Sequence, residues 1–232
     1  MSERLWAVVP AAGIGRRMGG EVPKQYLELQ GRRVIEHTLQ RLLDHPLIEG
    51  VYVALAPDDG YWQSCDFVTD TRVSRVAGGE ERCHSVLNAL HQLQTTAEPN
   101  DWVLVHDAAR PCLSAGDLDR LIETLRDHPV GGVLGVPVQD TLKRVSAEGE
   151  VAETVPRRDL WQAYTPQMFR LGLLTDALEQ ALKKGELVTD DASALELAGY
   201  RPIMVEGHAG NIKITRQADL ALATFYLSHP SA

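Results

Sequence analysis

The sequence predicts an α/β fold built on a doubly wound, mostly parallel, Rossmann-like β-sheet. Short apolar runs of strand length alternate along the chain with segments whose apolar residues recur at helical spacing. Glycine-containing turns follow several of these apolar runs, as they do in repeated strand-loop-helix units. The chain has 232 residues, of which 44% are hydrophobic and 24% charged. This size suits one α/β domain, spanning residues 1–232, with a sizeable core.

Six apolar runs are expected to form strands of this sheet. The first, Leu5 to Val9, is continuously apolar and ends at Pro10, which is typical of a strand buried on both faces. The other predicted strands are 51–56, 73–77, 102–105, 131–136 and 203–206. Ligands of doubly wound sheets bind beyond the carboxyl ends of the strands. Gly13, Gly79 and Asp107 all follow such ends, so we expect one crevice to gather them.

Six segments carry apolar residues at helical spacing. In the first, Ile35, Leu39 and Leu42 fall on one face of the predicted helix. The predicted helices are 34–43, 85–93, 118–125, 171–184, 192–198 and 217–227. Ser114 followed by Asp117 indicates a helix start, and Thr189-Asp190-Asp191 can cap the helix that begins at Ala192.

Residues 141–155 interrupt this alternation and predict a protruding β-hairpin. Its apolar positions, such as Leu142 and Val151, flank a turn-like tip at Ala147-Glu148-Gly149-Glu150. An isolated two-stranded hairpin is only marginally stable in water, so a second subunit is expected to cover it. We therefore predict a β-arm over residues 138–158 that serves dimerisation.

Charge and composition exclude several classes of protein. A formal net charge of -9 argues against a nucleic-acid partner. No apolar segment is long enough for a signal peptide or a membrane span, which predicts a cytoplasmic protein without a membrane partner. Cys65, Cys83 and Cys112 have no CxxC spacing, which argues against a disulfide framework or a cysteine zinc site.

The stretch after the first strand indicates a polyphosphate-binding loop. Small residues in Pro10-Ala11-Ala12-Gly13 let the backbone approach a bulky ligand, and Arg16, Arg17 and Lys24 add positive charge. The P-loop pattern fails, because Arg16-Arg17-Met18 stands where Gly-Lys-Ser/Thr is needed. The dinucleotide fingerprint is weak, because Met18 occupies the place of its third glycine. An ordinary surface loop with solvated charges remains the alternative from this stretch alone.

Five ordered motifs resemble those of a known family of nucleotidyltransferases. The motifs are Gly13-x-Gly15-x-Arg17-Met18 with Pro23-Lys24-Gln25, Gly78-Gly79-Glu80-Glu81-Arg82, Val105-His106-Asp107-Ala108-Ala109-Arg110-Pro111, Thr189-Asp190-Asp191-Ala192-Ser193 and Gly210-Asn211-Ile212-Lys213-Ile214-Thr215. Together they resemble the 2-C-methyl-D-erythritol 4-phosphate cytidylyltransferases of the non-mevalonate isoprenoid pathway. The resemblance implies a sheet of the nucleotidyltransferase type and a homodimer with embracing β-arms. It also implies a reaction that joins CTP to methylerythritol phosphate.

The resemblance also implies roles for individual residues. Arg17, Lys24 and Lys213 are expected to contact the triphosphate and to stabilise the pentacoordinate phosphorus. Ala11, Ala12 and Gly13 are expected to hold the nucleoside, and Gly79 and Ser85 to recognise cytosine. Thr141 and Arg157 are expected to bind methylerythritol phosphate, with Arg157 supplied by the neighbouring subunit. Asp190 or Asp191 is expected near the sugar or the metal.

Asp107 is the candidate ligand for Mg²⁺ or another divalent cation. It closes an apolar strand and is followed by two alanines, so its carboxylate is expected to project into the crevice. Mg²⁺ favours one or two carboxylates together with substrate phosphates and water. The alternative is that Asp107 caps a turn and pairs with Arg110. His106 is expected to pack or hydrogen-bond behind this aspartate.

Three other functions remain open from the sequence. A ribitol-5-phosphate cytidylyltransferase shares the same loop pattern but uses another acceptor. A non-catalytic CTP-binding module keeps the loop without the reaction. A glycosyltransferase of similar topology usually carries an Asp-x-Asp metal motif, which is absent where Asp107 stands.

Overall fold

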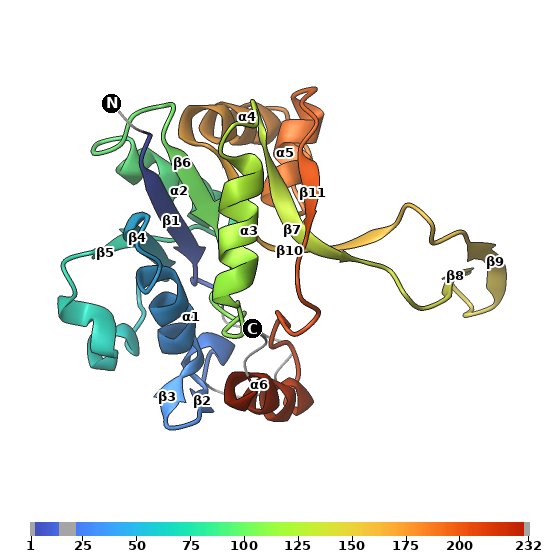
Figure 1. The fold of residues 1–232 in the computed structure, drawn as a ribbon, viewed down its shortest axis with the longest axis horizontal. Helices are drawn as coiled ribbons and strands as arrows, with labels where there is room; N and C mark the ends of the chain where they lie inside the picture. Colours follow the sequence, from blue (N-terminus) through green and yellow to red (C-terminus); the bar gives the residue numbers. More distant parts are fainter. Residues whose placement is uncertain (1–2, 14–21, 230–232) are drawn as a thin grey trace.

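A computed structural model describes residues 3–13 and 22–229 of the chain. Within these residues a seven-stranded sheet forms the centre of the molecule (Figure 1). Its strands are β1 Leu5–Pro10, β4 Ile48–Leu55, β5 Val73–Ala77, β6 Trp102–Val105, β7 Gly131–Pro137, β10 Trp161–Arg170 and β11 Ile203–Glu206. Their order across the sheet is β11-β7-β10-β6-β1-β4-β5.

The predicted mostly parallel, doubly wound α/β fold is confirmed. β1 pairs in parallel with both β4 and β6, and the pairs β4–β5 and β7–β11 are also parallel. The chain builds the β4–β5 side first and then returns to place β6 on the other side of β1. The strand order therefore reverses between β1 and β6, and ligands of such sheets bind at this kind of position.

β10 is the strand of the seven-stranded sheet that the sequence did not predict. It runs antiparallel to both neighbours, β6 and β7, and its register shifts between Ala163 and Gln167. Pro166 and the polar residues Thr165 and Gln167 lie inside this strand, so no apolar run marks it. Thr165 and Gln167 are nevertheless buried, because their polar atoms are hydrogen-bonded within the protein.

Helices cover both faces of the sheet. They are α1 Val34–Leu43, α2 Arg82–Leu93, α3 Ala115–Leu125, α4 Leu171–Lys183, α5 Asp191–Leu197 and α6 Ala218–Ser228. The predicted helix positions agree with these bounds to within a few residues. Ser114 caps α3 by accepting from Asp117 N, and Asp190 caps α5 by accepting from Ser193 N, as expected.

Two hydrophobic clusters lie on opposite faces of the sheet. Alternate residues of β1 divide between them: Ala7 and Val9 join one cluster, and Trp6 and Val8 join the other. The first cluster contains Leu39 of α1 and residues of α3, whereas the second contains residues of α2, α4 and α5. This division explains why β1 is apolar at every position, since both of its faces are buried.

Short elements complete the described chain. They are the 3-10 helices η2 Lys24–Tyr26, η3 Trp62–Ser64 and η4 Asp66–Thr69, with the two-residue strands β2 Glu28–Leu29 and β3 Arg32–Arg33. A third cluster, which includes Ile214 and Ala223, packs α6 beside these strands. No helix among the described residues is both long and apolar enough to cross a bilayer.

The predicted hairpin projects from the body of the molecule (Figure 1). It consists of β8 Leu142–Val145 and β9 Val151–Val155, which pair with each other in an antiparallel sheet. Gly149 at its tip has a φ of 87°, a value that favours glycine. Almost every residue of the two strands is exposed in this single chain.

Candidate active site

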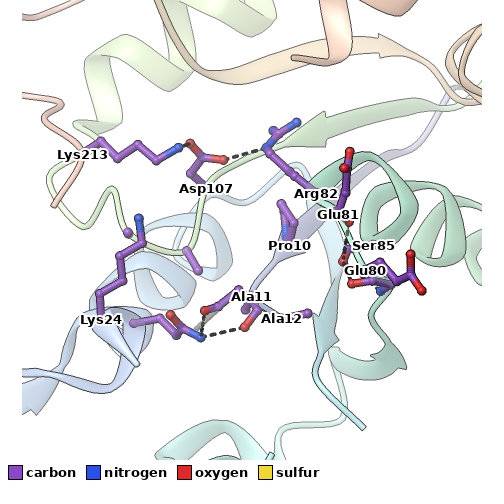
Figure 2. A pocket seen from close by; sticks show the side chains of 15 residues that line it. Pro10, Ala11, Ala12, Lys24, Glu80, Glu81, Arg82, Ser85, Asp107 and Lys213 are labelled. Carbon is purple, nitrogen blue, oxygen red and sulfur yellow. Dashed lines mark hydrogen bonds and ion pairs between the residues drawn. The ribbon is translucent and has the colours of Figure 1, made fainter. Parts of the chain in front are cut away.

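A cavity of about 350 Å³ lies at the carboxyl ends of β1, β5 and β6 (Figure 2). Its lining comes from five separate segments of the sequence. The lining residues are Pro10, Ala11, Ala12, Gly13, Lys24, Gln25, Gly79, Glu80, Glu81, Arg82, Ser85, Asp107, Ala108, Ala109 and Lys213. The expected crevice that joins Gly13, Gly79 and Asp107 is therefore present.

The loop after β1 is held in place by a buried glutamine. Gln25 Nε2 donates to Ala11 O at 2.7 Å and to Gly13 O at 3.1 Å, and Ala11 N donates to Ala54 O at 2.8 Å. Gln25 belongs to η2, whose first residue is Lys24, so the same short helix fixes the loop and brings Lys24 to the cavity. The small residues of this loop leave space for a ligand beside the lysine.

The loop after β5 packs closely against the loop after β1. A Cβ atom added to Gly78 would lie 2.3 Å from Ala12 Cβ and 3.0 Å from Leu55 O, so this position requires glycine. Ser85 Oγ accepts from Gly79 N at 3.0 Å and lies 3.2 Å from Glu81 O, to which its hydroxyl can donate. Ser85 thus stabilises the turn that leads into α2. The N-terminus of α2, which carries positive partial charge, begins at Arg82 on the cavity wall.

Asp107 is surrounded by cationic side chains. Lys213 Nζ lies 2.6 Å from its Oδ2, Arg82 Nε lies 3.0 Å from its Oδ1, and Arg110 Nε lies 3.8 Å from Oδ2. Burial alone would raise the pKa of Asp107, but the charges of Arg82 and Lys213 outweigh it and hold this pKa well below its usual range. Asp107 is therefore a carboxylate at every physiological pH. The alternative contact with Arg110 exists, but it is the longest of the three.

A hydrogen-bonded chain fixes the backbone of Asp107 from behind. Asp107 N donates to Thr165 Oγ1 at 3.0 Å, and Thr165 Oγ1 lies 3.0 Å from His106 Nδ1. His106 Nε2 lies 3.0 Å from Arg110 O, which can only accept, so the ring donates there and accepts from Thr165. Burial lowers the pKa of His106 to about 4, which keeps the ring neutral. His106 therefore packs and hydrogen-bonds behind Asp107, as expected.

Lys213 reaches the site because its neighbours are anchored in the core. Ile214 is fully buried and its N–H donates to Ala109 O at 2.8 Å. Asn211 Nδ2 donates to Thr165 O at 2.8 Å, and Arg110 Nη1 donates to Asn211 O at 2.6 Å. These contacts fix both sides of Lys213 and direct its ammonium group to Asp107.

A second cavity of about 300 Å³ adjoins the first. It is lined by Arg82, Asp107, Arg110, Ala163, Tyr164, Thr165, Gln167, Thr189, Asp190 and Lys213. Asp107, Arg82 and Lys213 line both cavities and therefore form the wall between them. Residues of β10 around its register shift supply one side, in keeping with the frequent place of such irregularities beside active sites.

The sequence profile of the IspD family, 2-C-methyl-D-erythritol 4-phosphate cytidylyltransferase, matches residues 5–229. The chain belongs to this family.

Relatives of the same description match almost the whole chain. A 2-C-methyl-D-erythritol 4-phosphate cytidylyltransferase of Pseudomonas fluorescens is 56% identical over 224 residues, covering 95% of each chain. One from Pseudomonas aeruginosa is 56% identical over 217 residues, covering 93% of each chain. The solved Francisella tularensis 2-C-methyl-D-erythritol 4-phosphate cytidylyltransferase is 37% identical with a TM-score of 0.84, covering 96% of this chain and 99% of that one. The 2-C-methyl-D-erythritol 4-phosphate cytidylyltransferase structure from Thermus thermophilus is 33% identical with a TM-score of 0.79. The match covers 98% of this chain and 100% of that one.

Most residues expected to act in this cytidylyltransferase line the first cavity. They are Ala11, Ala12, Gly13, Lys24, Gly79, Ser85, Asp107 and Lys213. Arg17 lies outside the described residues. Thr141 and Arg157 are exposed at the two ends of the arm and line neither cavity of this single chain, and Arg157 Nη1 donates to Gln139 O.

Several residues that hold the site together had no role in the sequence analysis. Arg82, Gln25, Thr165 and Gln167 are the clearest examples. Arg82 stood inside a quoted motif, which was the available signal for it. Asp191 is fully buried and pairs with Arg82 at 2.8 Å. No group of three or more His, Cys, Asp or Glu side chains among the described residues is arranged to hold a metal by itself.

Proposed function

We propose that this chain transfers the cytidylyl group of CTP to 2-C-methyl-D-erythritol 4-phosphate in the two adjoining cavities. The products are 4-diphosphocytidyl-2-C-methyl-D-erythritol and pyrophosphate. The observation that supports this function most strongly is the first cavity, where two small-residue loops, Lys24, Lys213 and the ionised Asp107 meet. Family membership over residues 5–229 supports the same reaction and favours it over the ribitol phosphate, non-catalytic and glycosyltransferase alternatives.

The first cavity is proposed to hold CTP. The base would lie against the loop of Gly79 and Ser85, which lines this cavity. The nucleoside would pass over Ala11, Ala12 and Gly13, and its phosphates would lie between Lys24 and Lys213, with Arg17 joining them. Cationic groups held in fixed positions stabilise the negative charge that develops on the phosphate oxygens during phosphoryl transfer.

The second cavity is proposed to receive the acceptor phosphate. It opens onto the other side of Asp107 and Lys213, and Arg110 on its wall can bind a phosphate. We propose that Thr141 and Arg157 complete this cavity from the arm, with Arg157 coming from the neighbouring subunit. The exposed apolar residues Val145 and Val151 of the arm support a homodimer, because they lack cover in the single chain.

Mg²⁺ or another divalent cation is proposed to bind at Asp107. The donor set fits: one carboxylate just beyond the end of β6, on the wall of the first cavity, leaves the remaining ligands to phosphate oxygens and water. When bound, the cation supplies charge neutralisation on the phosphates and orients them. The rest of the chemistry depends on the residues of the chain.

The reaction follows from position and charge. An oxygen of the acceptor phosphate attacks the α-phosphorus of CTP in line, and the bond from this phosphorus to its bridging oxygen breaks. Pyrophosphate leaves with the electron pair. The acceptor is already anionic near neutral pH, because the second pKa of a phosphate monoester is about 6, so no general base is required. Lys24 and Lys213 stabilise the equatorial and leaving oxygens.

We further propose a cytoplasmic protein whose residues 1–232 form one domain with its arm.

Replacing Lys24 by alanine tests the proposed function. We expect the wild-type chain to release pyrophosphate from CTP with methylerythritol phosphate and Mg²⁺, and Lys24→Ala to lower kcat/KM by roughly a hundredfold. Lys184→Ala is the matched control, since Lys184 is an exposed lysine at the end of α4. Pyrophosphate release is measured with methylerythritol phosphate and with ribitol phosphate. Turnover with ribitol phosphate alone, or equal rates for the two variants, would contradict the proposal.

A further inference from the structure

Arg82 lies between two carboxylates that belong to different elements. Its Nε is 3.0 Å from Asp107 Oδ1 and its Nη2 is 2.8 Å from Asp191 Oδ2. Arg82 is the first residue of α2, Asp191 is the first residue of α5, and Asp107 follows β6. In Figure 2, Arg82 and Lys213 approach Asp107 from opposite sides. One guanidinium group therefore joins three separate segments of the fold.

The two carboxylates differ in the number of their oxygens that have a hydrogen-bond or ion-pair partner. Both oxygens of Asp107 have a cationic partner, Arg82 for Oδ1 and Lys213 for Oδ2. Asp191 is 0% exposed, yet its Oδ1 has no hydrogen-bond partner among the described residues. A buried oxygen without a donor is costly, and a guanidinium group can satisfy both oxygens of one carboxylate at once. Asp191 thus has an unfilled place for a second N–H of Arg82.

The two cations paired with the oxygens of Asp107 repel a metal ion and occupy part of the space beside its carboxylate, so they weaken metal binding there. Lys213 has an alternative partner when a triphosphate enters the first cavity, because it lines that cavity. Arg82 has an alternative partner in Asp191, which it already contacts. Both cations can therefore leave Asp107 without becoming unpaired in a buried environment.

We infer that Arg82 is a positioning residue that alternates between two arrangements: it bridges Asp107 and Asp191, as in this structure, or it pairs with Asp191 alone when the metal and the nucleotide bind. The inference rests on the proposed function, in which Asp107 contacts the metal. In the first arrangement the chain binds the metal weakly. The nucleotide draws Lys213 to its phosphates, Arg82 moves fully onto Asp191, and the freed carboxylate takes the metal. Metal and nucleotide affinities are thus coupled through an ion pair outside the reacting groups.

Two variants of this pair test the inference through two different measurements. Arg82→Met with Asp191→Asn leaves the net charge unchanged and removes one cation from Asp107. We expect the affinity of the full chain for Mn²⁺ alone, measured by electron paramagnetic resonance, to rise roughly tenfold. Asp191→Asn alone leaves Asp107 as the carboxylate partner of Arg82. For this variant the factor by which Mn²⁺ tightens CTP binding, measured by calorimetry, should fall roughly tenfold.

Controls separate this inference from the proposed function. Arg72→Met with Asp70→Asn removes an exposed ion pair elsewhere and should change neither quantity. Asp107→Asn, added to the Arg82→Met and Asp191→Asn variant, should abolish the gain in Mn²⁺ affinity. If Asp107→Asn weakens Mn²⁺ binding but the paired variant matches the wild type, the role of Arg82 is overturned and the metal ligand stands. If Asp107→Asn has no effect, the metal assignment itself fails, and with it this inference. Should the paired variant not fold, an unchanged coupling factor in Asp191→Asn overturns the inference by itself.

Discussion

At the scale of single residues, the candidate site contains a carboxylate, Asp107, that neighbouring cations keep ionised. Asp107 is buried, yet the charges of Arg82 and Lys213 hold its pKa below the usual range of an aspartate. Its backbone is fixed by Thr165, whose hydroxyl in turn requires a neutral His106 as acceptor. Protonation of His106 would remove that acceptor, so the neutral ring is part of what positions Asp107.

The buried His106 predicts how stability depends on pH. In the folded chain burial lowers the pKa of His106 to about 4, whereas an unfolded histidine has a pKa of about 6.5. Below pH 6.5 or so, the unfolded chain therefore binds a proton that the folded chain does not, and the free energy of unfolding falls until about pH 4. Above the pKa of an unfolded histidine, His106 adds no pH dependence to the free energy of unfolding.

Urea unfolding of the wild type and of His106→Gln, at about pH 7 and about pH 5, measures this effect. Glutamine can keep a donor and an acceptor at this place but does not titrate. We expect the wild type to lose more of its unfolding free energy than the variant between these two pH values. Equal losses in the two proteins would show that His106 is not responsible.

At the scale of elements, two loops from neighbouring parts of the sheet form one wall of the cavity. Gly78 after β5 packs against Ala12 after β1, and Ser85 of α2 stabilises the turn that leads from Gly79 into α2. The close approach brings both loops to the wall of the same cavity. The contact between the loops therefore requires a small residue at Gly78.

Gly78→Ala should separate the two loops. The added methyl group would lie 2.3 Å from Ala12 Cβ, so the loops must move apart. We expect the free energy of unfolding to fall by about 1–3 kcal/mol and the Kd for CTP to rise. Gly60→Ala is the matched control, because a Cβ atom there meets no atom within 4 Å. Denaturant unfolding and calorimetric titration with CTP provide the two measurements. Wild-type CTP affinity in Gly78→Ala would contradict a role for this contact in binding.

Most elements could be predicted from the sequence because each carries its own local signal. The continuous apolar run of Leu5 to Val9 and the start of α3 at Ser114 are examples. β10 could not be predicted, because its polar residues are satisfied only by partners distant in the chain. Thr165 bonds to residues 58 and 59 positions away, at Asp107 and His106. Hydrogen bonds between residues so far apart in the chain allow polar residues to be buried without producing any hydrophobic periodicity in the sequence.

The candidate site shows the same limit. The loop before Lys24 could be interpreted from its own composition, whereas the place of Lys213 was implied only by the family resemblance. The ion pair of Arg82 with Asp191 joins residues 109 positions apart. Arg82 stood in a motif ahead of the predicted helix 85–93, and Asp191 was expected to cap a helix or to lie near the sugar or the metal, so nothing local paired the two. Local sequence can propose a phosphate-binding loop, but it does not show which distant charges meet there.

At the scale of the whole molecule, the arm carries apolar side chains that the single chain leaves exposed. Val145 is 55% exposed and Val151 is 61% exposed, and each lies on one strand of the arm. An antiparallel pair of this length has little stability of its own. A second copy of the chain is the partner that we propose for this surface.

Val145→Lys combined with Val151→Lys should weaken the proposed homodimer. Two charges placed on an apolar contact surface oppose its burial, so we expect a monomer by light scattering coupled to size-exclusion chromatography. Pyrophosphate release should fall while CTP binding persists, because the first cavity lies in the body of one chain. Leu47→Lys, at a residue that is 57% exposed in a turn outside the arm, is the control. A variant that remains dimeric and active would contradict this use of the arm.

The place where the arm leaves the sheet has a further consequence. Pro137 at the end of β7 and Trp161 at the start of β10 are paired neighbours, so the two stems of the arm depart side by side. The arm could therefore be lengthened, shortened or replaced between Pro137 and Trp161 without changing the order of the strands in the sheet. In the proposed function the arm helps to bind the acceptor, so acceptor binding could diversify while the order of the central sheet stays unchanged.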